Sequence, residues 1–270
     1  MTRPAKPQDI GGILDAGFRL YARGLKGVLL LTFMSSLISV LPSVVMGFLP
    51  MMGQDMGNIM RVAIAMVVLV PLYILVTLSI MAAVIAKLAA RAEGRSLGMG
   101  EAIRHGLRVF LKVLASGILY GLAVIGGFVL LIIPGVYISL ALMLGMYAII
   151  LDNLGPLEAL RRSHHLVKGN WWRTAVVITI PMMIYGSLIF GLQVPLAFAA
   201  MSFQNNILLS TLITQLGNLI MGTLLSPMIY AVTICLYRDL KLRKEGGDLL
   251  VRIRKATAEP QPCAPDVLPS

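Results

Sequence analysis

Six long apolar runs that contain no Asp, Glu, Lys, Arg or His dominate this sequence. Most of them reach the ~20 residues that an α-helix needs to cross the hydrocarbon core of a bilayer. A transmembrane β-strand needs only about ten residues of alternating polarity, so runs this long exclude a membrane β-barrel. The sequence therefore predicts an all-α, polytopic membrane protein with six transmembrane helices. The runs occupy residues 28–50, 62–86, 113–133, 134–151, 174–201 and 211–237.

The composition agrees with a membrane protein. Only 13% of the residues are charged and 58% are hydrophobic, whereas roughly 25% of the residues in a soluble domain are charged. So few charges leave too little polar surface to cover a globule in water. The net charge of +11 would suggest nucleic acid in a soluble protein, but in a membrane protein it indicates topogenic charge and anionic headgroups. We therefore expect anionic phospholipids, and no nucleic acid, as partners.

The third and fourth runs follow each other without an intervening charge. Together they are too long for one helix and short for two, and Ile133, Pro134 and Gly135 divide them. We expect a hairpin with its turn at these three residues, followed by a short fourth helix. On the third run, Gly117 and Gly121 form a G-x-x-x-G pattern, which allows close helix packing and is expected to act within the chain.

The basic residues sort into alternating segments. All but Arg61 of the 23 Lys and Arg residues lie before the first run, between the second and third, between the fourth and fifth, or after the sixth. Six crossings put all these segments on one side, which the positive-inside rule makes the cytoplasm. We therefore expect a multi-pass protein of the bacterial inner membrane with both termini in the cytoplasm.

The segments ahead of the odd-numbered runs have the pattern of amphipathic helices. Glu158-Ala-Leu-Arg-Arg, before the fifth run, echoes Glu101-Ala-Ile-Arg-His before the third, and residues 9–26 are a looser counterpart before the first. An acid in the first turn and bases in the last suit the helix dipole. Apolar residues at three- and four-residue steps favour helices that lie in the membrane interface. The echo raises the hypothesis that a unit of amphipathic helix plus hairpin occurs three times.

This organisation divides the chain into four parts. Residues 1–27 are expected to be a cytoplasmic amphipathic segment, and residues 28–237 the membrane domain. Residues 238–256 are expected to continue as a basic cytoplasmic segment. Residues 257–270 are rich in proline, cannot bury a core, and are expected to be disordered.

Basic and aromatic residues of the cytoplasmic segments are the candidate functional residues. The two Trp side chains are expected at the membrane edge, where indole rings prefer to lie. If the two echoing segments lie side by side, their arginines and the lysine that follows would form a pocket for a lipid headgroup. The residues expected to contact headgroups or a protein partner are Arg104, Arg108, Arg161, Arg162, Lys168, Trp171, Trp172 and Arg243.

No pattern in the sequence indicates catalysis, a metal or a cofactor. His105, His164 and His165 lack the H-x-x-x-H and H-E-x-x-H spacings, and Cys235 and Cys263 have no metal-binding spacing. No nucleophile motif, P-loop or dinucleotide fingerprint occurs. We therefore expect that the protein is not an enzyme by itself and holds no cofactor.

Two other functions stay open. Ion-coupled transporters commonly hold ionisable residues inside the bilayer, and the six runs contain none. Gln193, Gln215 and Asn218 could instead line a path for a neutral or amphipathic substrate in a passive transporter or lipid-moving protein. A third interpretation is a membrane scaffold for a partner protein. The three interpretations predict bound anionic lipid, a cavity at mid-bilayer and a stable protein partner, respectively.

Three stretches resemble a known family: Pro134-Gly-Val-Tyr, the segment 158–173 and the segment 234–246. They look like the YciC-type bacterial inner-membrane proteins of unknown function, which are similar to the membrane domain that accompanies some glycerophosphodiester phosphodiesterases. The resemblance implies a multi-pass envelope protein linked to phospholipid or envelope upkeep. It implies no phosphodiesterase activity, because these stretches do not include that catalytic domain. The shared residues are Glu158, Ala159, Leu160, Ser163, Leu166, Gly169 and Trp172, then Leu236, Tyr237, Asp239, Leu240 and Arg243.

Overall fold

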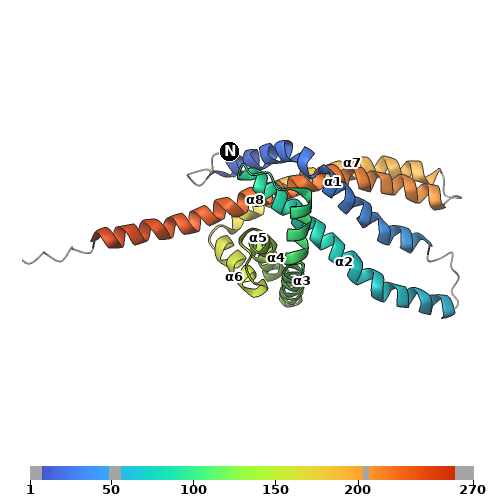
Figure 1. The fold of residues 1–270 in the computed structure, drawn as a ribbon, viewed down its shortest axis with the longest axis horizontal. Helices are drawn as coiled ribbons and strands as arrows, with labels where there is room; N and C mark the ends of the chain where they lie inside the picture. The colour runs from blue at the N-terminus through green and yellow to red at the C-terminus, as the bar shows by residue number, and fades with distance from the viewer. Residues whose placement is uncertain (1–7, 49–55, 203–206, 259–270) are drawn as a thin grey trace, which may run out of the picture.

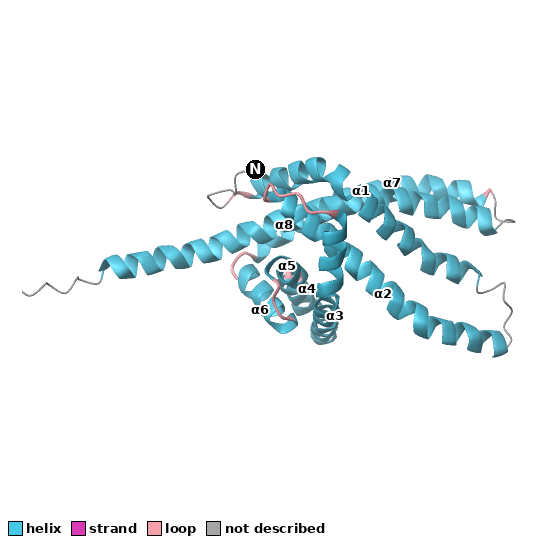
Figure 2. Ribbon diagram, viewed as in Figure 1, coloured by secondary structure: helices cyan, strands magenta, loops and turns pink. Residues whose placement is uncertain are grey.

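The computed structural model describes residues 8–48, 56–202 and 207–258. All regular structure in these ranges is helical (Figures 1 and 2). The described residues form α1 (Ile10–Phe48), α2 (Met56–Ala92), α3 (Met99–Leu130), α4 (Ile132–Leu142), α5 (Gly145–Asp152), α6 (Pro156–Val167), α7 (Trp171–Met201) and α8 (Ile207–Ala258).

Among the described residues, six helical stretches are long and apolar enough to cross a membrane, which confirms the predicted all-α, six-span architecture. The fourth stretch consists of α4 and α5 together. Large apolar side chains stay exposed on these helices, such as Val67 at 73% and Val129 at 80%. Because a lipid tail is as apolar as these side chains, such exposure suits a protein embedded in a bilayer. The spans are Ile10–Pro42, Met60–Ala92, Met99–Leu130, Ile132–Asp152, Trp171–Met201 and Leu209–Gly246.

The amphipathic segments before the first and third spans are continuous with those spans. α1 runs unbroken from Ile10, and α3 from Met99. Of the three amphipathic segments, only α6 is a separate helix, because Gly169, which follows the C-cap residue Lys168, adopts a φ of +86° and ends it. In the same way, the basic segment after the sixth span is a continuation of α8 as far as Ala258. The predicted disordered tail lies outside the described residues from position 259 on.

The predicted hairpin between the third and fourth spans forms, with its turn slightly earlier than expected. Leu131 is extended, with φ −166° and ψ 157°, and separates α3 from α4. Pro134 therefore lies in the first turn of α4, where its missing N–H costs no helical hydrogen bond. The two helices approach closely, since a Cβ placed on Gly127 would lie 2.9 Å from the Cα of Gly135.

An amphipathic segment precedes each of three hairpins, and we call each segment with its hairpin a unit. That the three units are a repeat stays a hypothesis. The hairpins are α1 with α2, α3 with α4 and α5, and α7 with α8. Each amphipathic segment packs a small residue against the second span of another unit, so the three units close on one another. The contacts are Gly17 with Val232 of α8, Gly106 with Ser79 of α2, and Ser163 with Ala141 of α4.

The prediction that Gly117 and Gly121 pack within the chain is wrong. A Cβ placed on either residue would have no described atom within 4 Å. The helix crossings instead use Gly17 and Gly106, which lie nearer the amphipathic parts of α1 and α3. The G-x-x-x-G pattern alone cannot tell which face of α3 meets a neighbour, because apolar residues surround it on every side.

Candidate functional site

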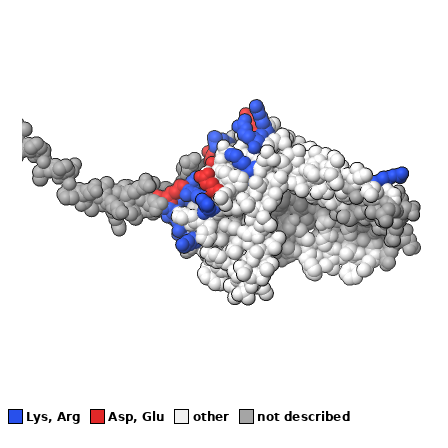
Figure 3. Space-filling view, turned by 90° about the horizontal axis from the view of Figure 1, so that it is seen from below, with Lys and Arg blue, Asp and Glu red and all other residues white. Residues whose placement is uncertain are grey.

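Basic side chains gather at one end of the molecule (Figure 3). The start of α1 and the far end of α8 lie toward this end, whereas α1 and α7 finish at the other (Figure 1). Arg61 lies in the first turns of α2, about 40 Å of helix away from Lys87. We call the end that holds Lys87 and the start of α1 the charged end.

At the charged end, α8 binds the end of α5. Asp152, the last residue of α5, accepts hydrogen bonds from Lys241 Nζ at 2.9 Å to both carboxylate oxygens and from the Tyr237 hydroxyl at 2.7 Å. An acid at a helix C-terminus is unfavourable beside the negative end of the helix dipole. Lys241 of α8 offsets this unfavourable interaction. The contact therefore joins α5 to α8 and neutralises the Asp152 carboxylate at the helix C-terminus.

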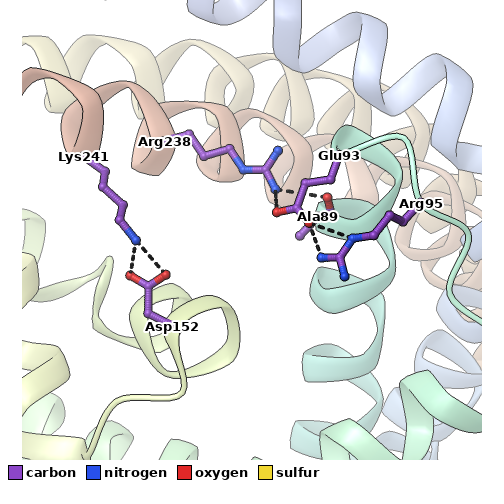
Figure 4. A network of polar contacts seen from close by, with 6 residues as sticks. All are labelled: Ala89, Glu93, Arg95, Asp152, Arg238 and Lys241. Atoms are coloured by element: carbon purple, nitrogen blue, oxygen red, sulfur yellow. Dashed lines mark hydrogen bonds and ion pairs between the residues drawn. The ribbon is translucent and has the colours of Figure 1, made fainter. Parts of the chain in front are cut away.

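A matching contact joins α8 to the end of α2. Glu93 follows the last residue of α2 and accepts from Arg238 at 2.9 Å, while Arg238 also donates to the carbonyl of Ala89 at 3.0 Å. Arg95 reaches the other oxygen of Glu93. Figure 4 shows Arg238 and Lys241 leaving α8 toward these two acids, which lie at the ends of α2 and α5. α8 is thereby held between α2 and α5.

A third acid, Asp239 of α8, binds the backbone just ahead of α1. Asp239 is only 5% exposed and accepts from the backbone N–H of Gln8 at 2.7 Å and from Arg243 Nε at 2.8 Å. Arg173 at the start of α7 lies 3.5 Å from the same carboxylate. Arg243 and Arg173 also donate to the Gln8 carbonyl. Arg243, which the sequence suggested as a headgroup contact, is thus engaged within the protein.

A pocket of about 600 Å³ opens at the charged end between α6, α8 and the end of α5. Arg162 pairs with Glu245 across its rim, and Lys241 pairs with Asp152. Such a mixture of arginines, a lysine and carboxylates suits an ionic ligand rather than an apolar one. The pocket is lined by Asp152, Leu154, Glu158, Arg161, Arg162 and Lys241.

The predicted clustering of the two echoing segments is confirmed for the helices but not for all their cations. α3 and α6 pack against each other, and Arg161 and Arg162 both line the pocket. Arg104, Arg108 and Lys168 are exposed and do not line it. Lys241 from α8 takes their place, so the pocket draws its cations from α6 and α8.

The two tryptophans have different surroundings. Trp171 is half-buried and stacks on Tyr137 of α4, with ring centroids 6.2 Å apart and planes 18° apart. Trp172 is 77% exposed. Trp172 thus suits the membrane edge expected for both residues, whereas Trp171 also fixes the start of α7 on α4.

The structure also places the histidines of a possible metal site and the three amides of a possible transport path. His105 contacts the carbonyl of Ile150 at 3.1 Å, and no group of three metal-ligating side chains occurs among the described residues. Gln193 donates to Asn218 at 2.6 Å, and Asn218 donates to Gln215 at 2.8 Å. The three amides proposed for a transport path therefore bind one another between α7 and α8.

Sequence reasoning missed Asp152, Leu154, Glu158 and Lys241 as pocket residues. A signal was present for Asp152, since an acid that directly follows an apolar span and ends its helix needs a cation nearby. Which cation serves it could not be read from the chain, because Lys241 is far away in sequence and meets Asp152 only through the packing of α8 on α5.

A model of the family described as Domain of unknown function (DUF7847) matches residues 84–240. The matched region includes the α3–α4 hairpin, the whole of α6, and α8 as far as Leu240. No curated protein and no solved structure matches the chain. The family model covers more than half of the sequence, and the chain therefore belongs to the DUF7847 family.

Proposed function

We propose that the protein lies in the bacterial inner membrane with its charged end in the cytoplasm, and that this end binds anionic phospholipid headgroups without catalysing a reaction. The observation that carries the proposal is the gathering of cations at one end of six apolar spans (Figure 3). Cations are enriched on the cytoplasmic side of membrane proteins. The negative surface potential of that leaflet attracts them by about 1 kcal/mol for each residue.

The cations best placed for this role are Arg104, Arg108 and Lys168. They are exposed, and no ion pair engages them within the described part of the chain. Arg104 and Arg108 lie one turn apart on α3, with the exposed Leu107 between them and Leu111 after them. Leucines beside arginines suit a surface that lies at the boundary between headgroups and acyl chains.

A role in phospholipid or envelope homeostasis is part of this proposal. Its support is the resemblance to the YciC-type proteins and to the membrane domains that accompany glycerophosphodiester phosphodiesterases. The residues of that resemblance include Ser163, Tyr237 and Asp239, which hold the charged end together. A common framework at this end is consistent with a common use of it.

The test replaces the three exposed cations together, as Arg104→Gln/Arg108→Gln/Lys168→Gln. Arg61→Gln removes an exposed cation at the opposite end and serves as the control. Purified proteins in phosphatidylcholine nanodiscs are compared before and after addition of phosphatidylglycerol, with thermal unfolding and co-purified lipid as readouts. We expect the stabilisation by phosphatidylglycerol to shrink in the triple variant and to persist in the control. An unchanged shift and unchanged co-purified anionic lipid in the triple variant would overturn the proposal.

A further inference from the structure

The pocket at the charged end is lined by one cation and one anion that form no ion pair within the described part of the protein. Lys241 is held by Asp152, and Arg162 by Glu245. Arg161 and Glu158 also line the pocket. Neither makes an ion pair with another residue in the described ranges. What the pocket offers a ligand is therefore one guanidinium and one carboxylate, both exposed on α6.

The two side chains lie on the same face of α6. Glu158 and Arg161 are three positions apart, which places them on adjacent turns of one helical face. The opposite face, with Ala159, Ser163 and Leu166, is buried in the protein. The orientation of α6 is thus set by packing, and its charged pair must point away from the core toward the pocket.

In the described part of the chain, Glu158 makes no hydrogen bond to the start of its own helix, whereas the equivalent acid of α3 does. Glu101 occupies the same place in the echoing segment and accepts the backbone N–H of Gly98 at 3.2 Å. Gly155 has nearly the same backbone angles as Gly98, but α6 has no side-chain cap. Glu158 lines the pocket instead. The Glu158 carboxylate still lies near the start of α6, since its Oε2 would be 3.9 Å from a Cβ placed on Gly155, but it lacks the hydrogen bond that Glu101 makes to its own helix.

We propose that this pocket binds a phosphate ester that carries a primary ammonium group, as in phosphoethanolamine. Arg161 binds the phosphate oxygens, for which the guanidinium fork is well suited. Glu158 accepts hydrogen bonds from the ammonium. The ligand is either the headgroup of phosphatidylethanolamine or a free phosphoethanolamine compound, since both present the same two charges.

This inference does not rest on the proposed binding of anionic lipid by Arg104, Arg108 and Lys168. A purely basic surface prefers net negative headgroups and has no use for an ammonium. The pocket is expected to prefer phosphatidylethanolamine over phosphatidylcholine, because the quaternary ammonium of choline has no N–H to donate to Glu158. A choice between two lipids of equal net charge therefore separates the pocket from the surface.

The experiment measures this preference in nanodiscs of phosphatidylcholine that contain increasing phosphatidylethanolamine, with bound lipid identified by native mass spectrometry. O-phosphoethanolamine is titrated in parallel by calorimetry. We expect the wild-type protein to prefer the ethanolamine lipid by about tenfold, as a charged hydrogen bond allows. Binding of O-phosphoethanolamine in the absence of that lipid identifies the free compound as a ligand, and binding of the lipid alone identifies the headgroup; either outcome supports the proposal.

The variants use the echoing segment as a matched control. Glu158→Gln is expected to abolish the preference for ethanolamine over choline, and Arg161→Gln to weaken binding of both lipids. Glu101→Gln makes the same change on α3 and is expected to leave the preference intact. Failure of the wild-type protein both to prefer the ethanolamine lipid and to bind O-phosphoethanolamine, or the same binding retained in full by Glu158→Gln, would overturn the inference. Loss of the phosphatidylglycerol effect in the triple variant alone would concern only the basic surface.

Discussion

The carboxylate of Asp239 accepts the backbone N–H of Gln8 at 2.7 Å, joining two positions that are 231 residues apart. The same carboxylate faces Arg173 and Arg243, and it is almost completely buried. The start of α1, the start of α7 and α8 therefore meet at one anion. A buried charge of this kind is tolerated only because several donors surround it.

Replacement of Asp239 by Ala should strongly destabilise the protein. Two arginines would lose their shared partner inside the structure, and breaking one side of a buried ion pair costs about 3–5 kcal/mol. Asp239→Asn keeps an acceptor for Gln8 and should cost less. Asp15→Ala is the control, because its pair with Arg19 is exposed and such pairs contribute at most about 1 kcal/mol after solvent screening. Thermal unfolding in detergent measures the stability of the three variants. An equal loss of stability in Asp239→Ala and Asp15→Ala would contradict the network.

Gly106 and Gly117 should respond oppositely to the same substitution. A Cβ on Gly106 would lie 2.1 Å from the carbonyl oxygen of Ser79, which is backbone and cannot move aside. Gly106→Ala should therefore separate α2 from α3 and cost about 1–3 kcal/mol. Gly117→Ala meets open space and should be neutral or stabilise the helix by up to about 1 kcal/mol. The unfolding midpoints of the two variants in one detergent decide whether the close helix crossing exists.

Ser163→Ala should destabilise the contact between α6 and α4. The Ser163 hydroxyl is buried and donates to the carbonyl of Ala141 at 2.7 Å. This carbonyl lies in the last turn of α4, where helical partners run out. Leaving it unpaired should cost about 1–3 kcal/mol. Ser139→Ala, whose hydroxyl bonds the carbonyl of Val136 within an exposed turn, should have little effect. Similar unfolding midpoints for the two variants would show that the buried hydrogen bond does not form.

Labelling with a membrane-impermeant maleimide should distinguish the two ends of the molecule in intact cells. In a background with Cys235 and Cys263 replaced by Ser, we expect Gly57→Cys, at the start of α2, to be labelled from outside. Ser96→Cys, in the exposed turn before α3, should be labelled only after the inner membrane is opened. Each site is exposed, so the difference reports orientation rather than burial. Labelling of Ser96→Cys in intact cells would place the charged end on the outer side and remove the cytoplasmic headgroup proposal.

The sequence by itself determined the helical class and the six spans. Long runs without charge form helices in a bilayer, because each backbone polar group must be hydrogen-bonded within the segment itself. Consecutive basic segments are separated by two spans each, so the number of spans also places all of them at the same end. The pattern also located α6 correctly, since Gly169 and Asn170 end it before α7 begins.

Tertiary structure decided where the polar side chains of the charged end go. Arg243 looked as exposed as Arg104 in the sequence, yet it lies against Asp239 and Gln8. Lys241 and Asp152 are far apart along the chain and meet because α8 packs on α5. The periodicity of apolar residues in the sequence determines which face of a helix is apolar. Ion pairs depend instead on which helices pack together and at which residues they cross. That relationship is set by small residues such as Gly17 and Gly106, whose role appears only when another helix is seen against them.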